Sequence, residues 1–96
     1  MSVTEFATLI VQAPHNIHSP VTKQFFEKVA TAQSGASGYP VHYFQDVGDP
    51  AILYIVTGWN DVAAHHAWIS GHTNQSLLAE MGSMVEVKEL VHLKIN

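Results

Sequence analysis

The sequence predicts an α+β fold in which four strands and two helices follow one another in the order βαββαβ, with both helices on one face of an antiparallel sheet. Three observations predict it. Four segments are rich in β-branched and apolar residues, as strands are. Two segments with apolar residues at three- and four-residue steps lie between the first and second strands and between the third and fourth. The chain has 96 residues, which leaves room for a single domain, 1–96.

The first part of the chain supplies one strand and one helix. Residues 4–12 are apolar and β-branched without a helical stripe, and a turn-like Ala-Pro-His-Asn cluster at 13–16 follows them. Ser19 and Pro20 then provide an N-cap and a first-turn proline for a helix. We expect this helix to end before the Ser/Gly-rich residues 34–38, whose composition is typical of a loop.

A hairpin follows the first helix. Residues 40–47 and 51–58 are β-rich, and a short Gly-Asp-Pro turn joins them. The second of these strands is apolar on both sides, so the sheet face without helices would be hydrophobic. Apolar residues make up 47% of the chain and charged residues only 12%. We therefore expect a homodimer in which two sheets pack face to face, as a dimeric α+β barrel.

The last part of the chain supplies a second helix and a final strand. Asn60 or Asp61 can cap the helix, Gly71 interrupts it, and a further helical piece covers about 73–81. Residues 84–95 alternate between apolar and polar types. With this strand the order of elements is that of a ferredoxin-like domain. Strict alternation puts Val85, Val87, Val91, Leu93 and Ile95 on one face and Glu86, Lys88, His92 and Lys94 on the other.

Charge and composition argue against several classes of partner. Four Lys and Arg stand against eight Asp and Glu, for a net charge of −4, so we expect no nucleic-acid partner. The chain has no cysteine, which excludes disulfides, thiolate nucleophiles and Cys-based metal sites. No apolar stretch reaches the ~18 residues that span a bilayer, and the N-terminus lacks a basic signal region. We expect no membrane partner and a cytoplasmic location.

One segment resembles a known family. Residues 57–72 read TGWNDVAAHHAWISGH. They are similar to the strand-to-helix segment of the antibiotic biosynthesis monooxygenase family in four features: a Trp that ends the third strand (Trp59), a short polar cap, Ala-His in the helix, and a Ser followed closely by a His. The resemblance implies a dimeric α+β barrel. It also implies an activity among those of the family, which includes cofactor-independent oxygenases of polycyclic phenols and haem-degrading enzymes.

The haem-degrading alternative is the weaker of the two. Such a member carries a Trp nine residues after the strand-ending Trp, as Trp68 does here, but also a haem-ligating His ten residues later, where this chain has Leu78. The first strand also lacks the Asn that those enzymes use. No His-x₃-His spacing or Gly-rich phosphate loop is present. We therefore expect neither a cofactor nor a metal.

Histidines are the candidate acid/base groups, because imidazole changes charge near neutral pH. Seven occur in the chain. His65, Trp68 and His72 fall at i, i+3 and i+7, which puts them on one face of an unbroken helix. His66 shares the apolar stripe of that helix, so we expect it to face the sheet more directly than His65 does. With the resemblance, His65, His66 and His72 become candidate catalytic residues, and the alternative is that they are solvent-facing.

Aromatic residues are the candidate substrate-binding groups. Trp59 and Trp68 can stack on a planar aromatic molecule, although core packing also explains Trp59. Tyr54, Tyr43 and His42 lie on the predicted hairpin and can project a phenol or an imidazole into a cavity under the helices. Tyr is also an ordinary strand residue.

The function hypothesis follows from the resemblance. It is a small cofactor-independent monooxygenase for an aromatic or polyketide-like substrate: a His deprotonates an acidic carbon, and the resulting carbanion reduces O₂ directly. One alternative is a non-oxidative acid/base catalyst, namely a cyclase, dehydratase or decarboxylase. A second is a non-catalytic dimer that binds a small molecule.

Overall fold

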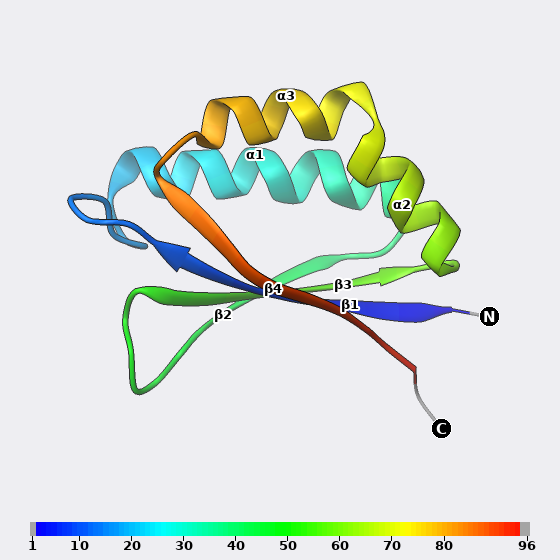
Figure 1. Cartoon of the computed structure of the whole chain (residues 1–96), viewed down its shortest axis with the longest axis horizontal. Helices are drawn as coiled ribbons and strands as arrows, with labels where there is room; N and C mark the ends of the chain where they lie inside the picture. The colour runs from blue at the N-terminus through cyan, green and yellow to red at the C-terminus, as the bar shows by residue number, and fades with distance from the viewer. Residues whose placement is uncertain (1, 95–96) are drawn as a thin grey trace.

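The computed structural model describes residues 2–94, which form a four-stranded antiparallel sheet with helices on one face (Figure 1). The order of the strands in the sheet is β2-β3-β1-β4, so β1 pairs with β3 on one side and β4 on the other. The predicted α+β, ferredoxin-like order is confirmed. The elements are β1 (Val3–Val11), α1 (Pro20–Ser37), β2 (Val41–Gln45), β3 (Ile52–Trp59), α2 (Val62–Ser70), α3 (His72–Met81) and β4 (Val85–Leu93).

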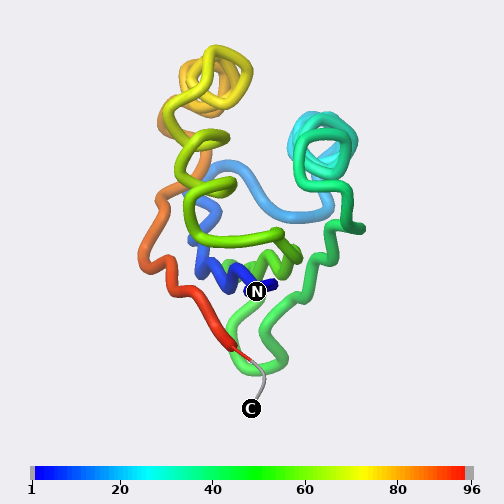
Figure 2. Tube along the Cα trace, turned by 90° about the vertical axis from the view of Figure 1, so that its right-hand side faces the viewer, coloured from blue at the N-terminus to red at the C-terminus, as the bar shows by residue number. Residues whose placement is uncertain are grey.

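The helices form a second layer above the sheet. Figure 2 shows α1 on the side of β2, and α2 and α3 on the side of β4. Every second residue of β1 and β3 points into this layer and is buried. The core between the layers includes Ala7, Leu9 and Ile55 from the sheet and Phe25 and Leu77 from the helices. Among the described residues, no helix has the length and apolar character needed to cross a bilayer.

The end of α1 differs from the prediction. The Ser/Gly-rich segment is helical up to Ser37, and only Gly38, with φ of 80°, leaves the helix. The Gly38 N–H donates to the Ser34 carbonyl at 2.9 Å, which closes the last turn. Gln33 and Ser37 are buried in the same turns. Tertiary packing of this face therefore overrides the loop-like composition.

The predicted interruption at Gly71 is confirmed, because two helices, α2 and α3, occupy this part of the chain. The Asp61 side chain caps α2 by accepting from the Ala64 N–H at 2.7 Å. Gly71 has extended backbone angles and separates α2 from α3. His72 therefore begins a new helix, and His65, Trp68 and His72 do not share the face that an unbroken helix would have given them.

The strict alternation predicted for the last strand is wrong because β4 contains a bulge. Thr8 pairs with Glu89 but Leu9 pairs with Val87, so Lys88 is an extra residue on β4. Before the bulge, Val85 and Val87 face the helices. After it, Leu90 and His92 do, opposite Ala7 and Glu5, while Val91 and Leu93 turn to the other face. Ile95 lies outside the described residues.

The face of the sheet without helices is mainly apolar. It carries the side chains that alternate with the buried ones, and they are only partly buried. Phe6 packs against Tyr54, with ring centroids 5.4 Å apart, and Phe44 is 54% exposed. Other members of this surface, called the open face below, are Thr4, Thr8, Ile10, His42, Ile52, Val56, Val91 and Leu93, with Glu86 and Glu89 on the edge strand β4.

Candidate active site

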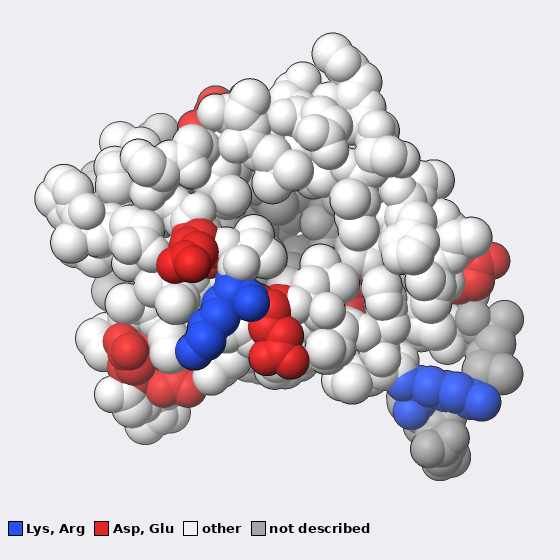
Figure 3. Space-filling model, in the orientation of Figure 1, with Lys and Arg blue, Asp and Glu red and all other residues white. Residues whose placement is uncertain are grey.

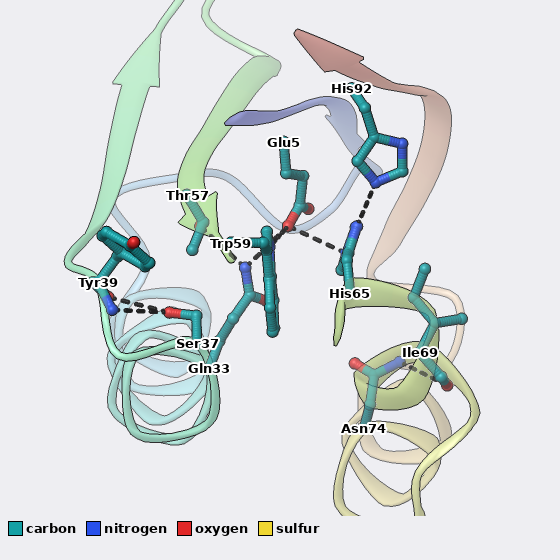
Figure 4. Close-up of polar contacts among 10 residues, drawn as sticks. All are labelled: Glu5, Gln33, Ser37, Tyr39, Thr57, Trp59, His65, Ile69, Asn74 and His92. Carbon is teal, nitrogen blue, oxygen red and sulfur yellow. Dashed lines mark hydrogen bonds and ion pairs between the residues drawn. The ribbon is translucent and has the colours of Figure 1, made fainter. Parts of the chain in front are cut away.

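A buried carboxylate lies between the sheet and the helices. Glu5 on β1 is 4% exposed, and its Oε1 accepts hydrogen bonds from Trp59 Nε1 at 2.9 Å and Gln33 Nε2 at 3.1 Å (Figure 4). His65 Nε2 lies 3.1 Å from the same oxygen. These groups come from β3, α1 and α2, so three elements converge on one atom. Burying a charge is costly unless polar groups compensate it, and this arrangement compensates Glu5.

Gln33 and Trp59 are themselves held in place. Gln33 Nε2 also donates to Thr57 Oγ1 at 2.9 Å, and both residues are buried. Trp59 is 1% exposed and stacks on His65, with ring centroids 4.7 Å apart and planes at 23°. The carboxylate oxygen therefore has a fixed position, because each group that contacts it has a second contact.

His65 links Glu5 to a second histidine. The cap at Asp61 starts α2 so that the side chain of its fourth residue, His65, points down to the sheet and is 2% exposed. Its Nδ1 lies 2.7 Å from His92 Nε2, a short hydrogen bond (Figure 4). Both ring nitrogens of His65 are therefore engaged, one by Glu5 and one by His92.

His92 is the outer member of this group. It lies on the edge strand β4, is partly buried, and packs edge-on against His65 and against His66, whose ring centroid is 5.9 Å away. Burial lowers the pKa of His92, the charges of His65 and His66 lower it further, and Glu5 opposes them. His92 is thus favoured as a neutral imidazole.

A cavity of about 230 Å³ adjoins the Glu5–His65 pair. Figure 3 shows the molecular surface hollowed between α3 and β4, where Leu78, Val87 and Leu90 form an apolar rim. Its wall is mainly apolar, and its polar side chains are Glu5, Gln33, His65 and Asn74, with the indole of Trp68. The remaining lining residues are Ala7, Leu9, Phe25, Phe26, Val29, Ile55, Ile69, Leu77 and Met81.

Two side-chain oxygens in the cavity wall are open acceptors. The hydrogen bonds between described residues reach Oε1 of Glu5 and not Oε2. Every buried side-chain N or O of these residues has a partner, so Oε2 keeps some accessible surface, and Glu5 lines the cavity. Asn74 Nδ2 donates to the Ile69 carbonyl at 3.1 Å, and Figure 4 shows its oxygen turned away from Ile69. A carbonyl only accepts, so the orientation of this amide is fixed.

The candidate catalytic histidines have different positions. His65 lines the cavity, whereas His66 is exposed on α2 and His72 is exposed at the start of α3. The expectation that His66 faces the sheet more directly than His65 is therefore wrong. The cap at Asp61 fixes the phase of α2, and stacking on Trp59 keeps His65 on the inner side.

The candidate aromatic residues also separate. Trp68 lines the cavity, whereas Trp59 is not part of the cavity wall and stacks on His65. The hydroxyl of Tyr43 donates to the Phe26 carbonyl at 2.7 Å, and Tyr43 lies beneath α1, away from this cavity. Tyr54 and His42 are on the open face, so the structure does not bring them to the cavity.

Sequence reasoning missed Glu5, Gln33 and His92. Glu5 had a signal, because it is the one charged residue among the inward positions of an otherwise apolar strand. Gln33 lay in a segment expected to lead into a loop. His92 had no local signal, because its direction depends on the bulge at Lys88.

Metal binding has no evident centre in the part of the chain described. Within residues 2–94, no three His, Asp or Glu side chains are placed to hold a metal ion.

Comparison with known proteins identifies the fold. No protein-family model matches the sequence, and no curated protein matches it significantly. Solved structures do match. A protein from Bordetella bronchiseptica, provisionally named an antibiotic biosynthesis monooxygenase, superposes with a TM-score of 0.83 over 99% of this chain and 97% of its own, at 16% identity. The chain has the antibiotic biosynthesis monooxygenase fold.

Two further structures share this fold. A protein from Deinococcus radiodurans with the same provisional name has a TM-score of 0.76 and 17% identity, over 100% of this chain and 93% of its own. SnoaB, a cofactor-independent oxygenase from Streptomyces nogalater, has a TM-score of 0.78 and 11% identity, over 98% of this chain and 92% of its own. At such identities the likeness concerns the fold alone.

Proposed function

We propose that this protein is a cofactor-independent oxygenase of the antibiotic biosynthesis monooxygenase type, with the Glu5–His65 pair as its base. One observation carries the proposal: a buried, ionisable pair adjoins a cavity that is otherwise mainly apolar. Hydrophobic packing has no need of such a pair, and buried ionisable groups at a cavity are typical of acid/base sites. The shared fold with SnoaB supports the same reaction class.

The substrate is a compact aromatic molecule with hydroxyl groups. A volume of about 230 Å³ lies below the ~300–1,000 Å³ of pockets that enclose drug-sized ligands. Trp68 and the aliphatic wall favour a planar apolar ring system. The open oxygens of Glu5 and Asn74 are acceptors, so they favour a ligand that presents donors such as phenolic hydroxyls.

In this proposal the carboxylate of Glu5 takes the proton from the substrate, and His65 acts through Glu5. Both ring nitrogens of His65 are engaged, whereas Glu5 lines the cavity and its Oε2 accepts no hydrogen bond from a described residue. A carboxylate in an apolar site is an effective base toward carbon acids. Glu5 removes a proton from an activated CH₂ group, and the carbanion transfers one electron to O₂. Collapse of the radical pair, with return of the proton, gives a hydroperoxide, which loses water to leave a carbonyl: CH₂ + O₂ → C=O + H₂O.

The same base would also serve a non-oxidative acid/base reaction, because Glu5 and His65 provide proton transfer and nothing that is specific to O₂. A cyclase, dehydratase or decarboxylase is therefore the second candidate. A non-catalytic binding protein is the third, and it would retain ligand affinity without turnover.

Oxygen uptake tests the oxygenase. We expect the metal-stripped protein to consume O₂ with a tricyclic anthrone above the spontaneous rate, equally with and without a chelator. Glu5→Gln and His65→Ala should abolish the excess rate, while His66→Ala, one residue along α2 and exposed, should retain it. Absence of uptake by the wild-type protein with a panel of anthrones and hydroquinones that bind to it would contradict the oxygenase proposal and favour the other candidates.

A homodimer through the open face is a further part of the proposal. This face is apolar, partly exposed, and opposite the helices. Large apolar patches on soluble proteins are usually covered by a partner. A second copy of the chain offers a matching apolar sheet, and packing the two sheets would also support β1, whose Glu5 faces the cavity on the other side.

A further inference from the structure

We infer that His92 is a positioning residue: it fixes the tautomer of neutral His65 and so keeps the Nε2–H of His65 directed at Glu5. The inference rests on the proposed function for its catalytic consequence, but its structural content, the placement of one proton, does not.

The bulge in β4 puts His92 in place. Without the extra residue Lys88, alternation would turn His92 to the open face, the face that carries Glu86. With it, His92 lies opposite Glu5 in the pairing of β4 with β1, on the same side as the helices. Bulges next to functional sites commonly re-aim a side chain in this way. The bulge thus brings a third ionisable side chain to the Glu5–His65 pair.

The contacts of His65 allow one neutral proton arrangement. Its Nε2 lies 3.1 Å from a Glu5 oxygen, where a bare lone pair would be repelled, so this nitrogen carries the hydrogen. Nδ1 is then an acceptor, and the 2.7 Å bond requires His92 Nε2 to donate to it. The N–H groups therefore point in one direction, from His92 to His65 to Glu5.

Addition of one proton to His65 reverses the direction of the hydrogen bond between His65 and His92. The His65 imidazolium would donate from Nδ1 to His92 Nε2 and from Nε2 to Glu5, and the carboxylate would be neutralised by a cation. The side chains that face His92 are His65 and His66 from α2 and Glu5 from β1. Donation from His92 Nε2 to His65 Nδ1 keeps the hydrogen of neutral His65 on Nε2, directed at Glu5.

Nitrogen NMR measures this arrangement directly. In uniformly ¹⁵N-labelled protein above neutral pH, we expect His65 as the Nε2–H tautomer, with a coupling across the hydrogen bond between its Nδ1 and His92 Nε2. In His92→Phe, which keeps a ring but has no N–H, His65 should become a mixture of tautomers. His92→Gln, whose amide can donate, should restore the single tautomer. His66→Phe is the matched control and should leave it unchanged.

The same variants are then assayed for turnover and pH dependence. We expect kcat to fall about tenfold in His92→Phe, as for loss of one hydrogen bond, with KM little changed, and to recover to within about twofold in His92→Gln. The acid limb of the pH profile should move in His92→Phe and return toward that of the wild type in His92→Gln.

Two results would overturn the inference. One is an Nδ1–H tautomer of His65 in the wild-type protein. The other is a single Nε2–H tautomer that persists in His92→Phe. If the tautomers behave as expected but no substrate is oxidised, the assignment of His92 stands and the oxygenase proposal fails.

Discussion

The two faces of the sheet are made by the same strands but have opposite characters. On the covered face, β1 places Glu5 in line with Ala7 and Leu9, and every buried side-chain polar atom of the described residues has a partner. On the open face, apolar side chains such as Phe6 and Phe44 lack such cover. One face therefore contains costly polar groups in an apolar setting, and the other leaves apolar groups partly exposed.

This contrast assigns different roles to the two faces: the covered face to catalysis and the open face to assembly. A buried polar cluster costs free energy that an apolar core would not, which makes a role in catalysis the better explanation. An exposed apolar sheet costs solubility and is best explained by a partner. Substitutions on the covered face should therefore change turnover without changing assembly, and substitutions on the open face should do the reverse.

Glu5 should give the largest effect on turnover. Glu5→Gln keeps an oxygen for the N–H groups of Trp59 and Gln33 but removes the base, so we expect turnover to fall about 10³-fold with little loss of stability. Glu5→Leu leaves those donors without an acceptor and should also lower the free energy of unfolding by about 1–3 kcal/mol. Steady-state kinetics and urea unfolding measure the two effects. Equal stability losses in both variants would contradict this account of the network.

The open face should give the largest effect on assembly. Val56 lies at its centre, opposite Phe6 on β1 and His42 on β2. Val56→Asp would bury an unpaired charge in a dimer and should raise the dissociation constant more than a hundredfold, about 3 kcal/mol. Sedimentation velocity at micromolar concentration measures it. Val21→Asp, on the 64% exposed side chain of a residue in α1, is the control that should leave the dimer intact. A wild-type monomer would refute the proposed dimer.

His92 should respond to its neighbours by a smaller amount. Its pKa is lowered from 6.5 by burial first and then by His65 and His66, so His66→Gln should move the pKa of His92 upward. Because the folded chain binds this proton less readily than the unfolded chain, stability should decline as the pH falls through 6.5 toward the lowered pKa. NMR titration of the His92 ring measures the shift. A downward movement in His66→Gln would show that the cause is assigned wrongly.

Tyr54 should give the smallest effect on the site. Its hydroxyl donates to Asp46 Oδ1 at 2.6 Å on the side away from the cavity, and this bond lowers the pKa of Asp46. Tyr54→Phe should raise the pKa of Asp46 and leave KM and kcat within about twofold of the wild type. A carbon-detected NMR titration and steady-state kinetics check the two halves. A large rise in KM would mean that Tyr54 contacts substrate after all.

The fold could be predicted from local patterns, and part of the site could as well. Period-two alternation in β1 and β3, the cap at Asp61 and the hairpin turn are written in short segments, and each depends on its neighbours in sequence. Placing His65 and Trp68 at a cavity rested on the family resemblance, and both residues lie in the cavity wall.

The rest of the site depends on contacts between distant segments. Whether Glu5 is a surface charge or a buried base is decided by Gln33 and Trp59, which are 28 and 54 residues away. The direction of His92 is decided by the pairing of β4 with β1, since the bulge at Lys88 has no sequence signal of its own. The Asp61 cap sets the residue at which α2 begins and therefore which side chains face the sheet. It puts His65 in the inner position that was expected for His66.

Proton exchange in the absence of oxygen tests the central claim most directly. Under argon in D₂O, the wild-type protein should exchange the acidic CH₂ hydrogens of an anthrone for deuterium faster than the spontaneous reaction, and Glu5→Gln should not. Mass spectrometry of the recovered anthrone measures it. This result would establish Glu5 as a base before any oxygen chemistry. Exchange that is no faster than in buffer, or that is undiminished in Glu5→Gln, would contradict the account.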